Sequence, residues 1–131
     1  MIVGLGSDIC NIERIEKAYR RFGQRFLFRC FGKEELSELK NIENDPKRLV
    51  ASLAKRFAAK ESFVKALGSG FNDGISWAEI EVLHQANGRP VLKISGEAER
   101  MLKQIAKETN LWLSLSDDHP WAQAVVVTEQ K

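Results

Sequence analysis

Residues 45–70 read DPKRLVASLAKRFAAKESFVKALGSG and predict the longest helix of the chain. Asp45 suits the N-cap and Pro46 the first helical position, while the glycine-rich residues 68–70 are typical of a helix end. The main apolar face of this helix is supplied by Leu49, Leu53, Phe57, Val64 and Leu67. We therefore expect a helix that begins at Pro46, ends near residues 68–70 and covers one side of a sheet.

Charged residues are interleaved with apolar ones in this helix, at Arg56, Lys60, Glu61 and Lys65. Because so much of the helix is apolar, we expect these side chains near its margins or in a cleft. Glu61 and Lys65 are four residues apart in the order that favours an ion pair on a helix surface, so a structural role stays open. The glycines that follow would let a ligand approach the backbone.

A second acid, Asp8, stands at the end of a predicted buried strand over residues 2–9. Gly4 and Gly6 allow close backbone approach in that strand, and we interpret them as packing residues, since the rest of a dinucleotide-binding loop is missing. Asp8 needs a partner or an ion, because burying an unpaired carboxylate is costly. A cap for the segment that begins near Cys10 is the alternative.

A basic amphipathic helix is expected after Asn11, which can cap it, with an interruption near Gly23. Its apolar side is formed by Ile12, Ile15, Tyr19 and Phe22, and its outer side carries Arg14, Lys17 and Arg21. Residues 14–29 hold six cations, Arg25 among them, against one acid, and this local excess favours an acidic partner. A short helix over residues 33–40 and a loop over 41–47 complete the first half.

The second half of the chain contains most of the predicted strands. Residues 77–84 and 91–94 flank the hairpin turn Asn87-Gly88, and Ser95 can cap a helix over residues 96–108 with Ala98, Leu102 and Ile105 inward. Alternating residues 111–116 and the run 121–128 predict two more strands, joined by a turn over 117–120. The predicted fold class is α+β, one domain over residues 1–131, with a small, largely antiparallel sheet packed against the long helix.

Composition excludes several classes of protein. The chain has 131 residues, 44% hydrophobic and 29% charged, with a net charge of +2, which is too small to predict nucleic-acid binding. Its apolar runs are shorter than a membrane helix and its start lacks the pattern of a signal peptide, so we expect a cytoplasmic protein. Cys10 and Cys30 are expected to be reduced, and with two histidines a zinc site is not predicted.

The residues themselves constrain the reaction less than they constrain the fold. Ser7, Ser62 and Ser116 have no neighbouring histidine in sequence, so metal-assisted transfer between bound substrates fits better than a covalent intermediate. Two carboxylates and several cations suit a divalent ion on a polyphosphate. A non-catalytic basic module that binds an acidic protein or RNA, and a small acyl-CoA thioesterase, are the alternatives.

Several motifs together resemble the holo-[acyl-carrier-protein] synthase family of small bacterial phosphopantetheinyl transferases. They are Gly4-Leu5-Gly6-Ser7-Asp8-Ile9, Phe57-Ala58-Ala59-Lys60-Glu61, Lys65-Ala66-Leu67-Gly68, Asn87-Gly88-Arg89-Pro90 and Leu113-Ser114-Leu115-Ser116-Asp117. The likeness runs from residue 2 to about residue 129. It implies the 4′-phosphopantetheinyl transferase fold and transfer of 4′-phosphopantetheine from coenzyme A to a serine of apo acyl carrier protein, in fatty acid biosynthesis.

The resemblance also implies roles for individual residues. Asp8 and Glu61 would hold Mg²⁺ on the pyrophosphate of coenzyme A, and Lys65 would contact phosphate. The remaining matched positions are Arg56, Lys60, Gly68, Ser69 and Gly70 near the nucleotide, and Arg14 with its basic neighbours Lys17, Arg21 and Arg25 facing the carrier protein. Family members are typically homotrimers with each active site between subunits.

The chain departs from the family pattern at Asp117, where many members have histidine. A role given to that histidine is not transferred to this chain. An acid near a phosphate is repulsive unless it meets a metal ion or a cation, so Asp117 is left out of the catalytic set.

Overall fold

The computed structural model describes residues 1–69, 71 and 74–131. Gly70, one of the expected nucleotide contacts, lies outside this part. The elements in chain order are β1 (Ile2–Asn11), α1 (Ile12–Phe22), α2 (Gln24–Cys30), α3 (Lys33–Leu39), η1 (Lys40–Ile42), α4 (Pro46–Leu67), η3 (Trp77–Glu79), β2 (Ile80–His84), β3 (Pro90–Ile94), α5 (Gly96–Ile105), β4 (Thr109–Asp118) and β5 (Trp121–Gln130).

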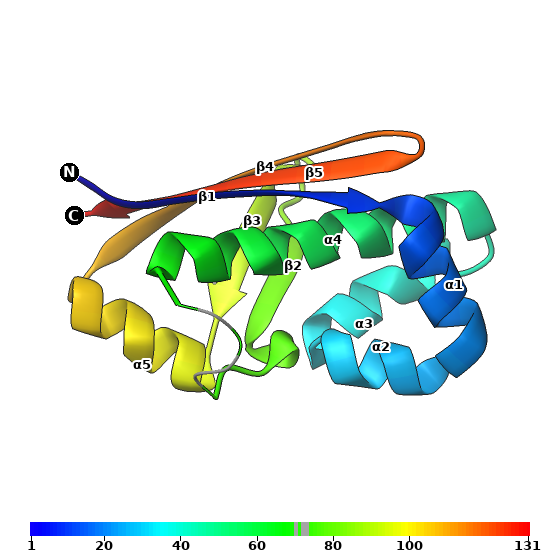
Figure 1. Cartoon of the computed structure of the whole chain (residues 1–131), viewed down its shortest axis with the longest axis horizontal. Coiled ribbons are helices and arrows are strands. Elements are labelled where there is room, and N and C mark those ends of the chain that lie inside the picture. The colour runs from blue at the N-terminus through cyan, green and yellow to red at the C-terminus, as the bar shows by residue number, and fades with distance from the viewer. Residues whose placement is uncertain (70, 72–73) are drawn as a thin grey trace.

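The main sheet contains the two ends of the chain. Its strand order is β1-β5-β4 and both pairings are antiparallel, with Asp8 opposite Ala124 and Leu113 opposite Val126. The two termini therefore lie side by side at one end of the molecule (Figure 1). The hairpin β2–β3 forms a separate antiparallel sheet. The predicted α+β class with antiparallel strands is confirmed.

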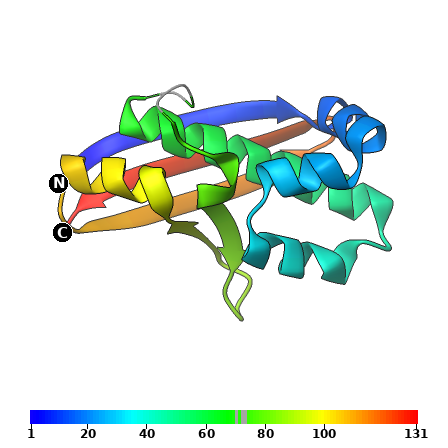
Figure 2. The same ribbon diagram turned by 90° about the horizontal axis from the view of Figure 1, so that it is seen from below.

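Helix α4 begins and ends where its flanking residues predict. The Asp45 side chain accepts a hydrogen bond from the Arg48 amide at 3.3 Å, and Gly68 ends the helix in the left-handed conformation at φ 75°. One side of α4 packs along β1 and β5, and its other side meets α1, the β2–β3 hairpin and α5 (Figures 1 and 2). Contacts on both sides explain why the helix is apolar nearly all round.

The glycines of β1 bring that strand unusually close to α4. A Cβ atom on Gly6 would lie 1.9 Å from the Ser62 carbonyl oxygen, and one on Gly4 would lie 2.2 Å from that of Ala66. Side chains alternate across a strand, so Gly4, Gly6 and Asp8 share the face that looks at α4. The interpretation of these glycines as packing residues is confirmed, and their packing brings Asp8 to the helix.

Three expected details are corrected. Phe22 and Ile105 do not point inward: they are 47% and 42% exposed, because each is the last residue of its helix and lies beyond the core. The helix expected over residues 96–108 ends at Ile105, where Ala106 becomes extended before β4. Trp77 begins a 3₁₀ turn rather than a strand, and its ring stacks between those of Phe57 and Phe71.

Among the described residues, no helix combines the length and the apolar character needed to cross a bilayer.

Candidate active site

Asp8 meets a cation from α4 at the end of β1. The Lys65 Nζ atom donates to Asp8 Oδ1 at 2.9 Å and to the Ser7 carbonyl oxygen at 3.0 Å. Side chains on a helix lean toward its N-terminus, which carries the Lys65 ammonium back along the helix to the acid. The Asp8 side chain is 21% exposed and that of Lys65 54%, so the pair lies at the surface, within reach of a ligand.

Glu61 lies one turn before Lys65 and shares this site. Its pKa is raised by partial burial and then by the negative charge of Asp8, while Lys65 and Arg14 act in the opposite direction. The charge of Asp8 thus acts on Glu61, although 53 positions separate the two acids in sequence. The structure therefore brings together Asp8, Glu61 and Lys65, the three residues predicted to carry the chemistry.

Cys10 borders this group of charges without being a candidate nucleophile. Burial raises its pKa to about 11, with Arg14 opposing the shift and the two acids adding to it. A thiol needs to ionise near neutral pH in order to attack. Cys10 and Cys30 are both buried free thiols, as expected for structural cysteines.

The pair of carboxylates fits a hard divalent ion better than a softer one. Within the described ranges, no group of three or more His, Cys, Asp or Glu residues is arranged to hold a metal ion. Mg²⁺ is usually bound by one or two carboxylates, with water and substrate phosphates filling the other positions. Two crowded acids that already attract the Lys65 ammonium form such a donor set.

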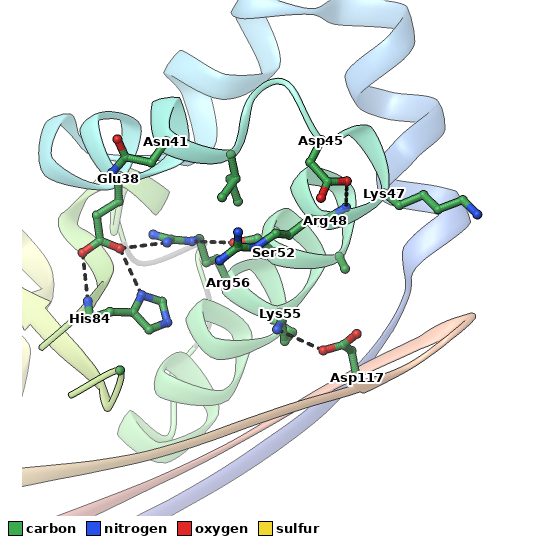
Figure 3. Close-up of a pocket in the computed structure, with 13 residues that line it drawn as sticks. Glu38, Asn41, Asp45, Lys47, Arg48, Ser52, Lys55, Arg56, His84 and Asp117 are labelled. Atoms are coloured by element: carbon green, nitrogen blue, oxygen red, sulfur yellow. Dashed lines mark hydrogen bonds and ion pairs between the residues drawn. The ribbon is translucent and has the colours of Figure 1, made fainter. Parts of the chain in front are cut away.

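A cleft of about 930 Å³ opens beside the first half of α4 (Figure 3). Its charged lining includes Arg48, Lys55 and Arg56 from the helix and Asp117 from the end of β4. Lys55 Nζ lies 2.9 Å from Asp117 Oδ1, so this acid does meet a cation. Its four cations, Lys47, Arg48, Lys55 and Arg56, outnumber its three acids, Glu38, Asp45 and Asp117, by one, so the lining carries a small excess of positive charge.

Comparisons with known proteins agree on the relationship. Residues 4–125 match the model of the 4′-phosphopantetheinyl transferase superfamily. The chain belongs to this superfamily. A holo-[acyl-carrier-protein] synthase of Maricaulis maris is 47% identical over 135 residues, covering 100% of this chain and 92% of that protein.

Two solved structures place the chain more narrowly among the holo-[acyl-carrier-protein] synthases. The enzyme of Neisseria meningitidis has a TM-score of 0.82 and 36% identity, covering 99% of this chain and 100% of that one. The enzyme of Bacillus anthracis, in complex with CoA (3′,5′-ADP), has a TM-score of 0.80 and 34% identity, covering 100% and 99%. The predicted family and fold are confirmed, and the chain is a phosphopantetheinyl transferase.

Lys60 does not lie where the sequence predicted. Its side chain is fully buried, not at a margin or in a cleft, and Nζ donates to Glu35 Oε1 at 2.6 Å, to the Trp77 carbonyl at 3.0 Å and to the Ile80 carbonyl. Burial lowers the pKa of Lys60, and the Glu35 charge opposes this shift. Arg56 is 3% exposed yet lines the cleft, as expected.

Two acids of α3 were not predicted from the sequence to have a role. Glu35 is fully buried beside Lys60, and Glu38 pairs with Arg56 at 2.9 Å and with His84 at 3.0 Å. The available signal was position: Glu35 is four residues before the buried Leu39 and so shares its face. In the sequence alone, that spacing is also typical of a charged residue on an exposed helix. The burial of Glu35 becomes evident only when the elements that pack against α3 are known.

The other predicted residues lie on the surface. Arg14, Lys17, Arg21 and Arg25 are all exposed, on α1 and the start of α2, with the exposed Phe22 ring beneath Arg21. At the end of α4, the buried Ser69 hydroxyl makes no hydrogen bond within the described residues. Arg14 of this basic face is near enough to Glu61 to lower its pKa, so the face adjoins the acid pair.

Proposed function

We propose that this chain transfers the 4′-phosphopantetheine group of coenzyme A to a serine of apo acyl carrier protein, within fatty acid biosynthesis in the cytoplasm. The observation that carries the proposal is the convergence of Asp8, Glu61 and Lys65 in a member of the holo-[acyl-carrier-protein] synthase group. The printed name of the Bacillus anthracis structure, a complex with CoA (3′,5′-ADP), supports the donor substrate.

The reaction is a phosphoryl transfer between two bound substrates. The serine oxygen of the carrier protein forms a bond to the phosphorus that bears pantetheine, and the pyrophosphate P–O bond breaks. The leaving group is adenosine 3′,5′-bisphosphate, and the serine proton passes to a base. Such transfers depend on alignment and on neutralising the non-bridging oxygens, so the protein needs no nucleophile of its own. This agrees with the high pKa of the Cys10 thiol.

Asp8 and Glu61 are the residues that would hold Mg²⁺. When bound, the ion supplies positive charge to the pyrophosphate oxygens. A shared cation would offset the repulsion between the two acids, and Lys65 would then be available to contact a phosphate oxygen. We assign Lys65 to the phosphate because its side chain is more than half exposed and already lies at this site.

The nucleotide end of coenzyme A is assigned to the side of α4 that carries Arg56 and to the turn at Gly68, Ser69 and Gly70. Arg56 lines the cleft beside α4, and the buried Ser69 hydroxyl makes no hydrogen bond within the described part of the chain. We leave Lys60 out of the direct contacts. Its three N–H donors are all used inside the protein, and a phosphate would have to break that arrangement.

The carrier protein is assigned to the basic face formed by Arg14, Lys17, Arg21 and Arg25. These side chains are exposed together on α1 and α2, and Arg14 lies close enough to Glu61 to lower its pKa. A partner that binds this face would therefore deliver its serine near the acid pair. The face complements an acidic surface, and such pairing accelerates encounter more than it adds affinity.

Homotrimer assembly is proposed from the outer face of the main sheet. Leu5, Ile9, Trp112 and Trp121 project from the side opposite α4 and are 45–66% exposed. A contiguous apolar face of this kind is typical of a protein interface. Packing of identical copies would cover these side chains.

The decisive experiment uses Asp8→Ala and Glu61→Ala, with Asp118→Ala as an exposed acid on β4 for comparison. Apo acyl carrier protein, coenzyme A and Mg²⁺ are mixed with each variant, and mass spectrometry records the modified carrier protein. Wild type and Asp118→Ala should give complete modification, whereas the other two should give none while still melting cooperatively. Full modification by Asp8→Ala and Glu61→Ala would refute the assignment.

A further inference from the structure

Lys60, the residue just before Glu61, is held in place by three hydrogen bonds. The Lys60 ammonium has three N–H donors, and all three are taken by Glu35, the Trp77 carbonyl and the Ile80 carbonyl. The side chain is 0% exposed. Moving Lys60 away from these partners would leave buried charges unpaired and would strongly destabilise the folded protein.

Glu35 is fixed in turn by backbone groups. Its Oε1 atom accepts from the Gly32 amide at 3.0 Å, and its Oε2 atom accepts from the Val82 amide at 3.0 Å. The carboxylate is thereby tied to the start of α3 and to β2 before it meets Lys60. Because these bonds hold Glu35 on α3 and β2, its ion pair with Lys60 holds α4 in place relative to those elements.

A second tie lies one turn earlier on the same side of α4. Arg56 donates from Nη1 to the Val82 carbonyl at 2.5 Å. It also donates from Nη2 to Glu38 at 2.9 Å (Figure 3). Residues four apart lie on one helix face, so Arg56 and Lys60 together hold this face against α3 and β2.

The opposite side of α4 is also fixed. The Ser62 hydroxyl has one proton and two acceptors within reach, the Ala58 carbonyl of α4 at 2.7 Å and the Ala124 carbonyl of β5 at 3.1 Å. The Ser62 backbone carbonyl lies directly against Gly6 of β1. Successive helical residues are rotated by about 100°, so a helix with Lys60 held on one side and Ser62 on the other has Glu61 pointing between them. That direction leads to Asp8.

We infer that Glu35 is a positioning residue of the transferase, which acts through Lys60 to set the rotation of α4 that aims Glu61 at Asp8. This inference rests on the proposed function, because it concerns the metal carboxylates. Glu35 touches no substrate and has no part in the chemistry. Losing it should weaken metal binding at the Asp8–Glu61 pair rather than only the stability of the fold.

The test replaces the buried pair with neutral side chains of similar size, Glu35→Gln with Lys60→Met. The matched control is Glu34→Gln with Lys93→Met, which removes the adjacent ion pair between α3 and β3, exposed by 53% and 52%. This control pair does not involve α4. Mn²⁺ binding in the presence of coenzyme A is measured by loss of the free-ion electron paramagnetic resonance signal, together with thermal melting and the Mg²⁺ dependence of transfer.

The buried double variant should bind Mn²⁺ about tenfold more weakly and need about tenfold more Mg²⁺ for half-maximal transfer, a difference of about 1.4 kcal/mol. The exposed double variant should match wild type. A cooperatively folded buried variant with wild-type Mn²⁺ affinity would overturn the inference. If that variant does not fold, the milder Glu35→Gln alone is judged by the same affinity.

Asp8→Asn separates this inference from the proposed function. Loss of Mn²⁺ binding by Asp8→Asn together with wild-type binding by the buried double variant refutes only the role of Glu35. Retention of both metal binding and transfer by Asp8→Asn refutes the metal site itself.

Discussion

The Lys65 ammonium lies 2.9 Å from Asp8 Oδ1, across the junction between β1 and α4. This ion pair joins the first strand to the end of the longest helix, and it neutralises an acid that Glu61 would otherwise repel. The same lysine is the group assigned to phosphate. Its positive charge offsets the repulsion between Asp8 and Glu61.

Replacing Lys65 with methionine should lower kcat for transfer about 100-fold, the typical loss for one group that stabilises developing charge. Lys65→Arg retains the positive charge and should lose much less. The free energy of unfolding should fall by at most about 1 kcal/mol, because the ion pair is partly solvated. Steady-state kinetics and denaturant unfolding measure the two effects. Equal losses of activity in both variants would argue against a charge role.

Glu61→Gln should stabilise the metal-free protein at neutral pH while abolishing transfer. The folded-state pKa of Glu61 is raised by burial and by Asp8, so the protonated carboxyl is favoured by the fold and the ionised one is disfavoured. The penalty is absent below the unfolded-state pKa and is complete above the folded-state pKa. The gain should be small at pH 7, because solvent screens the partly exposed carboxylate, and it should vanish in acid. Melting curves from pH 3 to pH 8, read against wild type, test this dependence, and a gain that grows toward acid would contradict it.

Gly6→Ala should destabilise the protein by about 3 kcal/mol, the upper range for overpacking. The added Cβ would lie 1.9 Å from the Ser62 carbonyl oxygen, and backbone on both sides leaves no flexible side chain to yield. Gly88→Ala is the control, since that site has open space and a φ of 86°. Its cost should be about 1 kcal/mol from backbone strain alone. Urea unfolding gives both values, and similar costs would mean that β1 can move away from α4 freely.

Reversing two charges on the basic face, Lys17→Glu with Arg21→Glu, should raise KM for the carrier protein at least tenfold at low salt. The KM for coenzyme A should stay unchanged. Both side chains are exposed, and neither belongs to the acid pair. Lys103→Glu with Lys107→Glu reverses two exposed charges near α5, at the other end of the molecule (Figure 1), and serves as the control. The difference should shrink as salt screens the charges; equal effects of the two double variants would show that only net charge matters.

Leu5→Asp should turn the proposed trimer into a monomer, because a charge would be buried within an apolar interface. Phe28→Asp is a matched control: both residues are 66% exposed, but Phe28 lies on α2, away from the outer face of the sheet. Sedimentation equilibrium of wild type and both variants gives the assembly state. A monomeric wild type, or a trimer that survives Leu5→Asp, would exclude this face as the interface.

Much of the fold follows from local patterns. Asp45, Pro46 and Gly68 predicted both ends of α4, since capping and backbone conformation depend on a few neighbouring residues. Ile105 shows the limit of such reasoning, because its helical spacing indicated an inward side chain although the helix ends there. Periodicity identifies a face, but the extent of an element depends on what it packs against.

The candidate site was only partly visible in the sequence. Asp8 and Glu61 stood out from their surroundings in the sequence and from the family motifs, and the contact of Gly6 with Ser62 brings their two elements together. Lys60 was misplaced because a lysine between apolar residues is normally at a surface. Glu35 approaches from another helix and offsets the free-energy cost of burying the Lys60 charge.

The sequence by itself determined the helices and strands, the family and the residue types needed to bind a metal ion and phosphate, because these depend on spacing and side-chain chemistry. Tertiary structure alone decided which charges meet: Lys65 with Asp8, Lys55 with Asp117, and Lys60 with Glu35. The physical reason is that the strength of a charge pair depends on the distance and burial of its partners, and residues far apart in the chain set both.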